Sequence, residues 1–119
     1  MQPERKGVHG KMKNSRLFSG DRYATRGIAD RIDPAIQKAL WRAIEVRKER
    51  GDQLDYLQVF VLSVEVVDGE PLQKVLNRQE QPEHRETFYV DGVDKPIGGV
   101  TIWVIDSGTY ATMLFPYEY

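Results

Sequence analysis

The sequence predicts a single α+β domain, in which one main helix packs on a curled, mostly antiparallel sheet of about five or six strands. Three observations lead to this fold class. Apolar residues recur at helical spacing over residues 34–50 and alternate at strand spacing over 56–67 and 100–105, and turns that contain glycine separate these segments. The expected order of elements is therefore β-α-β-β-β-β(-β).

Length and composition fit one ordinary globular domain. The chain has 119 residues, of which 40% are hydrophobic and 29% charged, so it can bury a sizeable core. It contains no cysteine, which excludes disulfides, thiolate metal sites and thiol nucleophiles and fits a reducing compartment. No secretory signal and no membrane-spanning apolar run are visible, so we expect a cytoplasmic protein with no membrane partner.

The beginning of the chain differs from the rest. Residues 1–20 are polar, basic and interrupted by glycines, so we expect them to form a mobile basic arm. The single α+β domain should then cover residues 21–119. Its first segment, residues 22–27, has the composition of a short strand that ends at a glycine.

The main helix has signals at both ends. Asp33 can accept hydrogen bonds from backbone N–H groups of the first turn, and Pro34 suits the first helical position. Gly51 is the expected stop after a basic last turn near Arg50. One face of this helix is apolar and consists of Ile36, Leu40, Ala43 and Ile44.

Residues 56–67 predict a long central strand. One of its faces is apolar throughout, and the other is apolar only at the start, so we expect the helix to cover one side and the other side to be partly covered. The continuously apolar face consists of Phe60, Leu62, Val64 and Val66. Asp68-Gly69 is a hairpin signal. The remaining strands, expected in an antiparallel meander, are residues 72–79, 87–90, 100–105 and 110–115.

The net charge of −1 hides an asymmetry. Residues 1–50 carry thirteen Lys and Arg and six Asp and Glu, whereas residues 51–119 carry four and twelve, which gives +7 and −8. Opposite halves can attract each other within one fold, which we favour, or a basic face can meet an acidic partner.

No motif in the sequence specifies a reaction. Phosphate-binding glycine loops and nucleophile elbows are missing, and we expect no catalytic, cofactor-binding or metal-binding residues. His84 lies between Glu83 and Glu86 in a charged segment, and we expect a solvated turn histidine rather than a ligand of a weak metal site. A pair of catalytic carboxylates has no sequence signature and stays open as a hypothesis.

Two groups of residues are candidates for binding a partner. The first combines arginines with aromatic rings, which suits a phosphate backbone and stacked bases, and consists of Arg16, Phe18, Arg22, Tyr23 and Arg26. The second is aromatic, as protein interfaces often are, and consists of Phe115, Tyr117 and Tyr119, which Trp41 and Trp103 would extend. Both groups also have structural interpretations. The arginines can pair with Asp55 or Glu118, and the C-terminal segment can form a last strand on the core.

Four segments together resemble the domain-of-unknown-function 960 family. They are RYATRG (22–27), LDYLQVF (54–60), RQEQPE (78–83) and TMLFPYEY (112–119), so the resemblance covers about residues 22–119. The family consists of small proteins of Gram-positive bacteria, some of them carried on phages and mobile elements. The resemblance implies a bacterial cytoplasmic setting and one domain, and it implies no activity or mechanism.

The missing catalytic signals, the segregated charge and the aromatic C-terminal end favour a small non-enzymatic adaptor or modulator that binds another protein. The alternative is a nucleic-acid-associated protein that uses the basic arm and the basic residues of the helix. The third hypothesis is an enzyme whose carboxylates assemble in space.

Overall fold

The computed structural model describes residues 16–119, and its main helix, α3 (Pro34–Glu49), begins and ends where the sequence places its caps. Oδ1 of Asp33 accepts a hydrogen bond from the backbone N–H of Ala35 at 2.8 Å, and Gly51 ends the helix with a φ of 84°. The predictions for this helix are confirmed.

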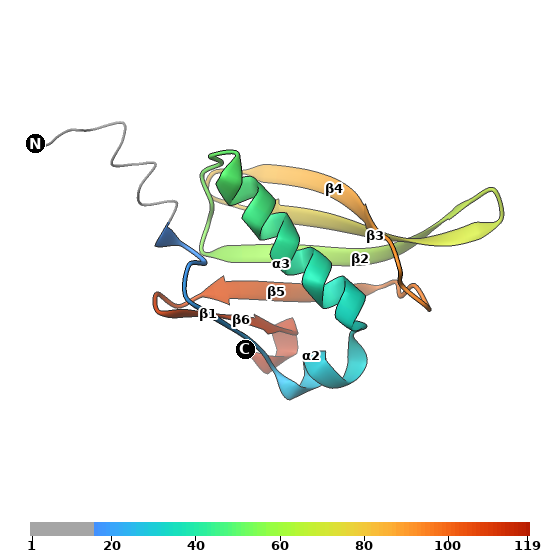
Figure 1. Cartoon of the computed structure of the whole chain (residues 1–119), viewed down its shortest axis with the longest axis horizontal. Helices are drawn as coiled ribbons and strands as arrows, with labels where there is room; N and C mark the ends of the chain where they lie inside the picture. Colours follow the sequence, from blue (N-terminus) through green and yellow to red (C-terminus); the bar gives the residue numbers. More distant parts are fainter. Residues whose placement is uncertain (1–15) are drawn as a thin grey trace, which may run out of the picture.

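Six strands of the described residues form one mixed, mostly antiparallel sheet, which confirms the α+β class (Figure 1). They are β1 (Asp21–Ala24), β2 (Leu57–Val67), β3 (Glu70–Gln79), β4 (His84–Val90), β5 (Val100–Asp106) and β6 (Tyr110–Leu114). The spatial order is β1-β6-β5-β2-β3-β4, and β1 runs parallel to β6. The predicted simple meander is therefore wrong, because the chain leaves β4 at one edge and returns to pair β5 with β2.

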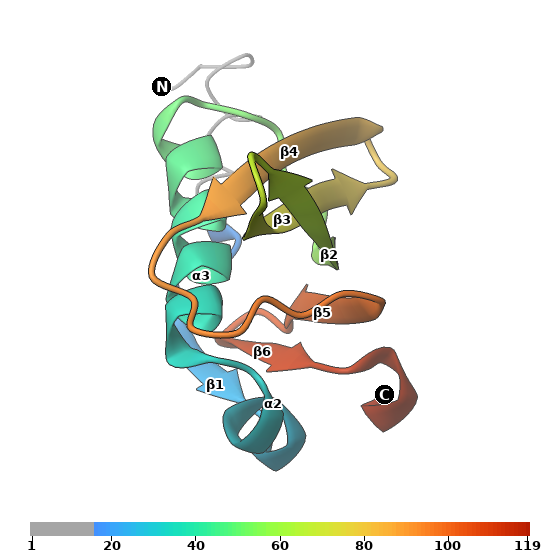
Figure 2. The same ribbon diagram turned by 90° about the vertical axis from the view of Figure 1, so that its right-hand side faces the viewer.

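The sheet curls around α3, so that both of its edges bend toward the helix (Figure 2). The core lies between α3 and the helix-facing side of the sheet. Its fully buried residues include Ile36, Leu40 and Ile44 of α3 and Phe60, Leu62, Val75, Ile102 and Met113 of the strands. None of the described helices is long and apolar enough to span a membrane.

A short helix, α2 (Arg26–Arg31), follows β1 and was missed by the sequence reasoning, which assigned residues 22–27 to a strand ending at Gly27. The strand already ends at Ala24. Thr25 then caps the helix, because its Oγ1 accepts a hydrogen bond from the backbone N–H of Ile28 at 3.2 Å.

The hairpin between β2 and β3 has the expected turn, in which Asp68 and Gly69 both adopt positive φ angles of 52° and 81°. Val64 and Val66 are exposed, however, although the sequence places them on the covered face. Pairing of β2 with β5 stops at Leu62. Beyond this residue β2 and β3 form a two-stranded ribbon that extends past the other strands (Figure 1).

Most of the expected arm, residues 1–15, lies outside the described residues. Phe18 is described, and its side chain is 1% exposed. Its backbone N–H donates to Oδ1 of Asp106 at 3.0 Å, and its carbonyl accepts from Nζ of Lys48 at 3.2 Å. The packed part of the chain thus begins before residue 21, and the Phe18 ring is not available to stack on a base.

Candidate functional site

The first group of predicted binding residues does not form one surface. Arg22 lies over the ring of Trp41, with 5.1 Å from the guanidinium carbon to the ring centroid, and pairs with Glu45 of α3 rather than with Asp55 or Glu118. Tyr23 points to the opposite side of the sheet.

Arg16 and Arg26, the remaining basic members of that group, are exposed. Within residues 16–119 neither forms a hydrogen bond or an ion pair. The structure therefore leaves these two arginines available and uses Arg22 internally.

The basic residues of α3, and Arg50 directly after it, are mostly engaged within the fold. Arg42 pairs with Glu49 and Arg50 with Asp52, while Lys48 donates to the carbonyl of Phe18. These bonds leave a smaller basic surface than the sequence suggests.

The second group surrounds an arginine that the sequence reasoning did not select. The guanidinium of Arg31, at the end of α2, lies 4.5 Å from the ring centroid of Phe115 and 5.6 Å from that of Tyr117. The two rings stack on each other, with centroids 5.3 Å apart and planes 6° apart. We call these three residues the Arg31 platform.

The Arg31 platform borders a hollow of about 400 Å³. Its walls come from α2, from the start of β5 and from the C-terminal turn η1 (Pro116–Glu118). The lining residues are Arg31, Gly99, Val100, Thr101, Phe115, Pro116 and Tyr117. Phe115 is buried, whereas Tyr117 is 71% exposed, so the hollow has a fixed floor and an accessible aromatic wall.

A clasp between Thr25 and Glu118 positions the Arg31 platform. Oε1 of Glu118 accepts hydrogen bonds from Oγ1 of Thr25 and from the backbone N–H of Phe115, each at 2.8 Å. Gly27 leaves room for this carboxylate, since a Cβ there would lie 2.5 Å from Oε2 of Glu118.

The side of the sheet opposite α3, here called the outer face, is unusually apolar. In β2 and β5 the residues that alternate with the core-facing ones are Leu57, Val59, Val61, Thr101, Trp103 and Ile105. Tyr119 packs edge-on against Trp103, with ring centroids 5.8 Å apart, and Tyr23 packs in the same way against Tyr110. Figure 2 shows α3 on the other side of the sheet and the C-terminal end of the chain on this side, beside β5 and β6.

A buried arginine that the sequence analysis missed joins α3 to the sheet. Arg47 is 2% exposed, and its guanidinium donates hydrogen bonds of 2.9 to 3.1 Å to four side chains, which are Asp52, Gln58, Asn77 and Gln79. The three amide side chains are themselves buried. The sequence contained a signal for this buried network. The amide residues of β2 and β3 lie on the same face of their strands as the apolar core residues, where polar side chains are unexpected.

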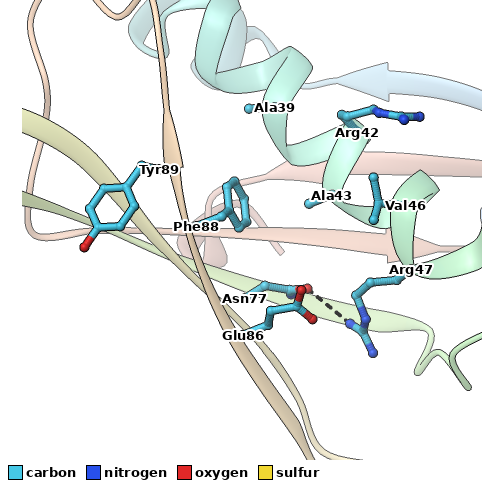
Figure 3. Close-up of a pocket in the computed structure, with 9 residues that line it drawn as sticks. All are labelled: Ala39, Arg42, Ala43, Val46, Arg47, Asn77, Glu86, Phe88 and Tyr89. Atoms are coloured by element: carbon cyan, nitrogen blue, oxygen red, sulfur yellow. Dashed lines mark hydrogen bonds between the residues drawn. The ribbon is translucent and has the colours of Figure 1, made fainter. Parts of the chain in front are cut away.

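A cavity of about 280 Å³ lies beside this network, between α3 and β4 (Figure 3). Ala39, Ala43 and Val46 face Phe88 across it, while the Tyr89 ring points away. Its floor is already hydrogen-bonded, because Asn77 Oδ1 accepts from Arg47 and both amide hydrogens of Asn77 have acceptors. The cavity is therefore shallow and mainly apolar, and few of its polar groups are free to bind a ligand.

Two carboxylates, Asp52 and Glu86, come close to His84 near the end of α3. One ligand atom from each of these three residues lies within 4.8 Å of the others. Arg50 binds both carboxylates, so a cation at this point would have to displace its guanidinium. His84 is the first residue of β4 and lies 2.9 Å from Oε1 of Glu86, so it is not the solvated turn residue expected from the sequence.

Arg50 also determines the pKa values of Asp52 and Glu86. Its hydrogen bonds lower the pKa of Glu86 from 4.5 to about 2, with a smaller contribution from His84, and they also lower the pKa of Asp52. Both groups are thus held as charged ion-pair partners. A general acid needs the opposite shift, so this pair gives no support to the hypothesis of catalytic carboxylates.

The four segments of the family resemblance meet in two places. Residues 22–27 contact residues 112–119 through the clasp and through the pairing of β1 with β6. Residues 54–60 contact residues 78–83 around Gln79, which donates to the carbonyl of Pro82 and accepts from Gln58 and from the backbone of Asp55. Each meeting point holds distant parts of the chain together.

A protein of unknown function from Enterococcus faecalis, whose crystal structure is known, has a similar fold. The two structures have a TM-score of 0.71 and 22% sequence identity, and the match covers 87% of this chain and 95% of the other. At this identity the likeness supports the fold alone. No curated protein matches this chain.

The family model described as "Staphylococcal protein of unknown function (DUF960)" matches residues 21–118. The match includes all but the last residue of the four segments on which the resemblance was based. The chain therefore belongs to the DUF960 family.

Proposed function

We propose that this protein is a non-enzymatic binding module that recognises another protein through the Arg31 platform and its hollow. One observation carries the proposal: the flat guanidinium of Arg31 rests on two aromatic rings, yet within residues 16–119 its N–H groups have no acceptor. Arginine and tyrosine, with tryptophan, are the residue types enriched among those that dominate the free energy of binding at protein interfaces. A partner segment with a carboxylate or exposed carbonyl groups fits these donors.

The proposal can be tested by crosslinking from inside the hollow. An aromatic photo-crosslinking residue would replace Tyr117, and in a matched control the same residue would replace Lys38, which is exposed on α3. We expect one protein to be captured from Gram-positive cells at position 117 and not at 38. The purified partner should bind the wild-type chain and should bind Arg31→Ala at least about tenfold more weakly.

Three results would reject this function. In the first, the same protein is captured at positions 117 and 38. In the second, Arg31→Ala leaves the affinity of the captured protein unchanged. In the third, only nucleic acid is captured. The last result would support the nucleic-acid alternative, which should then show binding that weakens steeply with salt and requires Arg16 and Arg26.

A further inference from the structure

We propose that the groove between α3 and the free edge of β4 binds an extended segment of another protein, which joins the sheet as an additional strand. The segment carries apolar side chains at every second position and a carboxylate on its other face. This site is separate from the Arg31 platform, because α2 contacts β1 and β6 at the opposite end of the strand order.

The free edge of β4 has unpaired backbone groups. Successive residues of an antiparallel strand direct their N–H and C=O groups to alternate sides. The carbonyl of Leu62 accepts from the N–H of Gly99 on the β5 side, so even-numbered residues of β2 bond toward β5 and odd-numbered ones toward β3. Unbroken registers carry this alternation through β3 to β4. The N–H and C=O groups of Arg85, Thr87 and Tyr89 therefore point away from the sheet, and they have no hydrogen-bond partner among residues 16–119.

The cavity of about 280 Å³ lies along this edge (Figure 3). Tyr89 borders the cavity although its ring points away from it, which places the free edge of β4 at the rim. The wall on the helix side consists of short side chains, among them Ala39 and Ala43. A strand added to β4 would place every second side chain beside Phe88, facing this wall.

The opposite edge of the sheet shows a different arrangement. There the Arg22 guanidinium of β1 lies 5.1 Å from the ring centroid of Trp41, and the same arginine pairs with Glu45. Long side chains of α3 thus fill the space next to β1. On the β4 side Ala39 and Ala43 leave the corresponding space open to apolar side chains from an added strand.

The charges at this edge favour a carboxylate on the other face of the segment. Arg85 is exposed on the outer face, directly opposite Arg78 of β3, and neither arginine forms an ion pair within residues 16–119. Glu80 and Glu83 border the same hollow without pairing with them. A carboxylate next to Arg85 on the added strand would form a favourable cross-strand pair and offset the repulsion between the two arginines.

These features together specify the kind of partner. In strand addition the backbone hydrogen bonds supply affinity, and the pockets for alternate side chains supply specificity. A second copy of β4 fits the groove less well, because its own helix-facing side chains include His84 and Glu86. It would bring these polar groups to an apolar wall, which costs free energy.

Hydrogen exchange of the full chain, measured by NMR, tests whether the edge is free. We expect the amides of Arg85, Thr87 and Tyr89 to exchange at least about tenfold faster than those of Glu86 and Phe88, which bond to β3. Protection of the first three amides in the free chain would overturn the proposal, because residues 1–15 or a second copy would then already occupy the edge.

A displayed library of linear peptides of about eight residues, selected on the full chain, supplies the probe. We expect the selected peptides to alternate apolar residues and to contain Asp or Glu. When bound, they should protect the amides of Arg85, Thr87 and Tyr89. Methylation of the peptide nitrogens should weaken binding at every second residue, because only those N–H groups point toward β4.

Variants of the chain test the groove and the edge separately. Ala43→Leu fills the groove and should weaken peptide binding at least about tenfold, while Lys38→Leu, at an exposed position of the same helix, should leave it unchanged. Thr87→Pro removes an N–H of the free edge and keeps the bonds between β3 and β4, so it should also weaken binding about tenfold. Thr87→Val keeps this N–H and is its control. Should Thr87→Pro fail to fold, the methylated peptides test the same hydrogen bonds.

Several outcomes would overturn the proposal. In one, no peptide is selected. In another, the bound peptide leaves the three edge amides unprotected, or binds Ala43→Leu as tightly as the wild-type chain. Arg31→Ala should not change the affinity of the peptide, and a peptide that requires Arg31 would belong to the Arg31 platform instead. The groove and the proposed function can therefore fail independently.

Discussion

Thr25 and Glu118 are 93 positions apart in sequence, and a hydrogen bond of 2.8 Å joins their side chains. The Thr25 hydroxyl donates this bond to Glu118 and also accepts from the N–H of Ile28, so one residue caps α2 and fixes the C-terminal turn. We expect Thr25→Ala to lower the free energy of unfolding by about 1 to 2 kcal/mol, because both bonds are lost. Urea unfolding measures this, with the exposed turn residue Thr109→Ala as control.

Gly27 gives a sharper test of the same clasp. A helical Gly→Ala change usually stabilises by about 0.5 to 1 kcal/mol, but here the new Cβ would lie 2.5 Å from Oε2 of Glu118. We expect Gly27→Ala to give no gain in the wild-type chain and to recover the gain in the Glu118→Ala background. Equal effects in both backgrounds would show that Glu118 does not restrict this position.

Arg47 should be the most sensitive polar residue of the fold. Its replacement by methionine removes one donor from each of three buried amide oxygens and from Asp52, and it leaves Oδ1 of Asn77 with none. We therefore expect a loss of about 3 to 5 kcal/mol in the free energy of unfolding. Arg42→Met, on the exposed part of the same helix, should change it by no more than about 1 kcal/mol. Similar losses for the two variants would contradict a central role for the network.

The hairpin turn between β2 and β3 needs a glycine because of its backbone conformation. Gly69 has a φ of 81° with open space around it, so an added side chain would strain the backbone without any clash. We expect Gly69→Ala to destabilise by about 1 kcal/mol. Gly98→Ala is the control, because its Cβ would make only ordinary contacts at 3.6 Å.

Local signals predicted the elements whose interactions lie close in sequence. Asp33, Pro34 and Gly51 define α3, and Asp68-Gly69 defines the hairpin, because caps and turns involve residues within a few positions of one another. The short helix α2 was missed because it has only six residues and contains a glycine. Gly27 is needed there because the side chain of Glu118, far along the chain, lies against it.

Long-range arrangements could not be predicted in the same way. The parallel pairing of β1 with β6 and the return of β5 to β2 depend on which edges meet in space. The Arg31 platform also depends on the pairing of β1 with β6, because this pairing brings α2 next to Phe115 and Tyr117. The sequence indicated the two aromatic residues by composition and gave no reason to join them to Arg31.

The ion pair between Arg50 and Glu86 predicts how stability depends on pH. The pKa of Glu86 falls from 4.5 to about 2 in the folded chain, mainly through the hydrogen bonds from Arg50. A lowered pKa stabilises the folded state above the unfolded value, and this contribution disappears as the pH falls from about 4.5 to about 2. Unfolding in urea between about pH 6 and about pH 2.5 should therefore show a loss of stability in acid that is smaller in Glu86→Gln.

Two variants separate this ion pair from general acid unfolding. Arg50→Gln should reduce the acid-dependent loss as Glu86→Gln does, because it removes the donor that lowers the pKa of Glu86 and of Asp52. Glu83→Gln changes an exposed carboxylate that has no partner among the described residues, so its pH profile should follow that of the wild-type chain. If all three variants lose stability in parallel with the wild type, the acid sensitivity has its origin elsewhere, and Arg50 serves only to link α3 to β4.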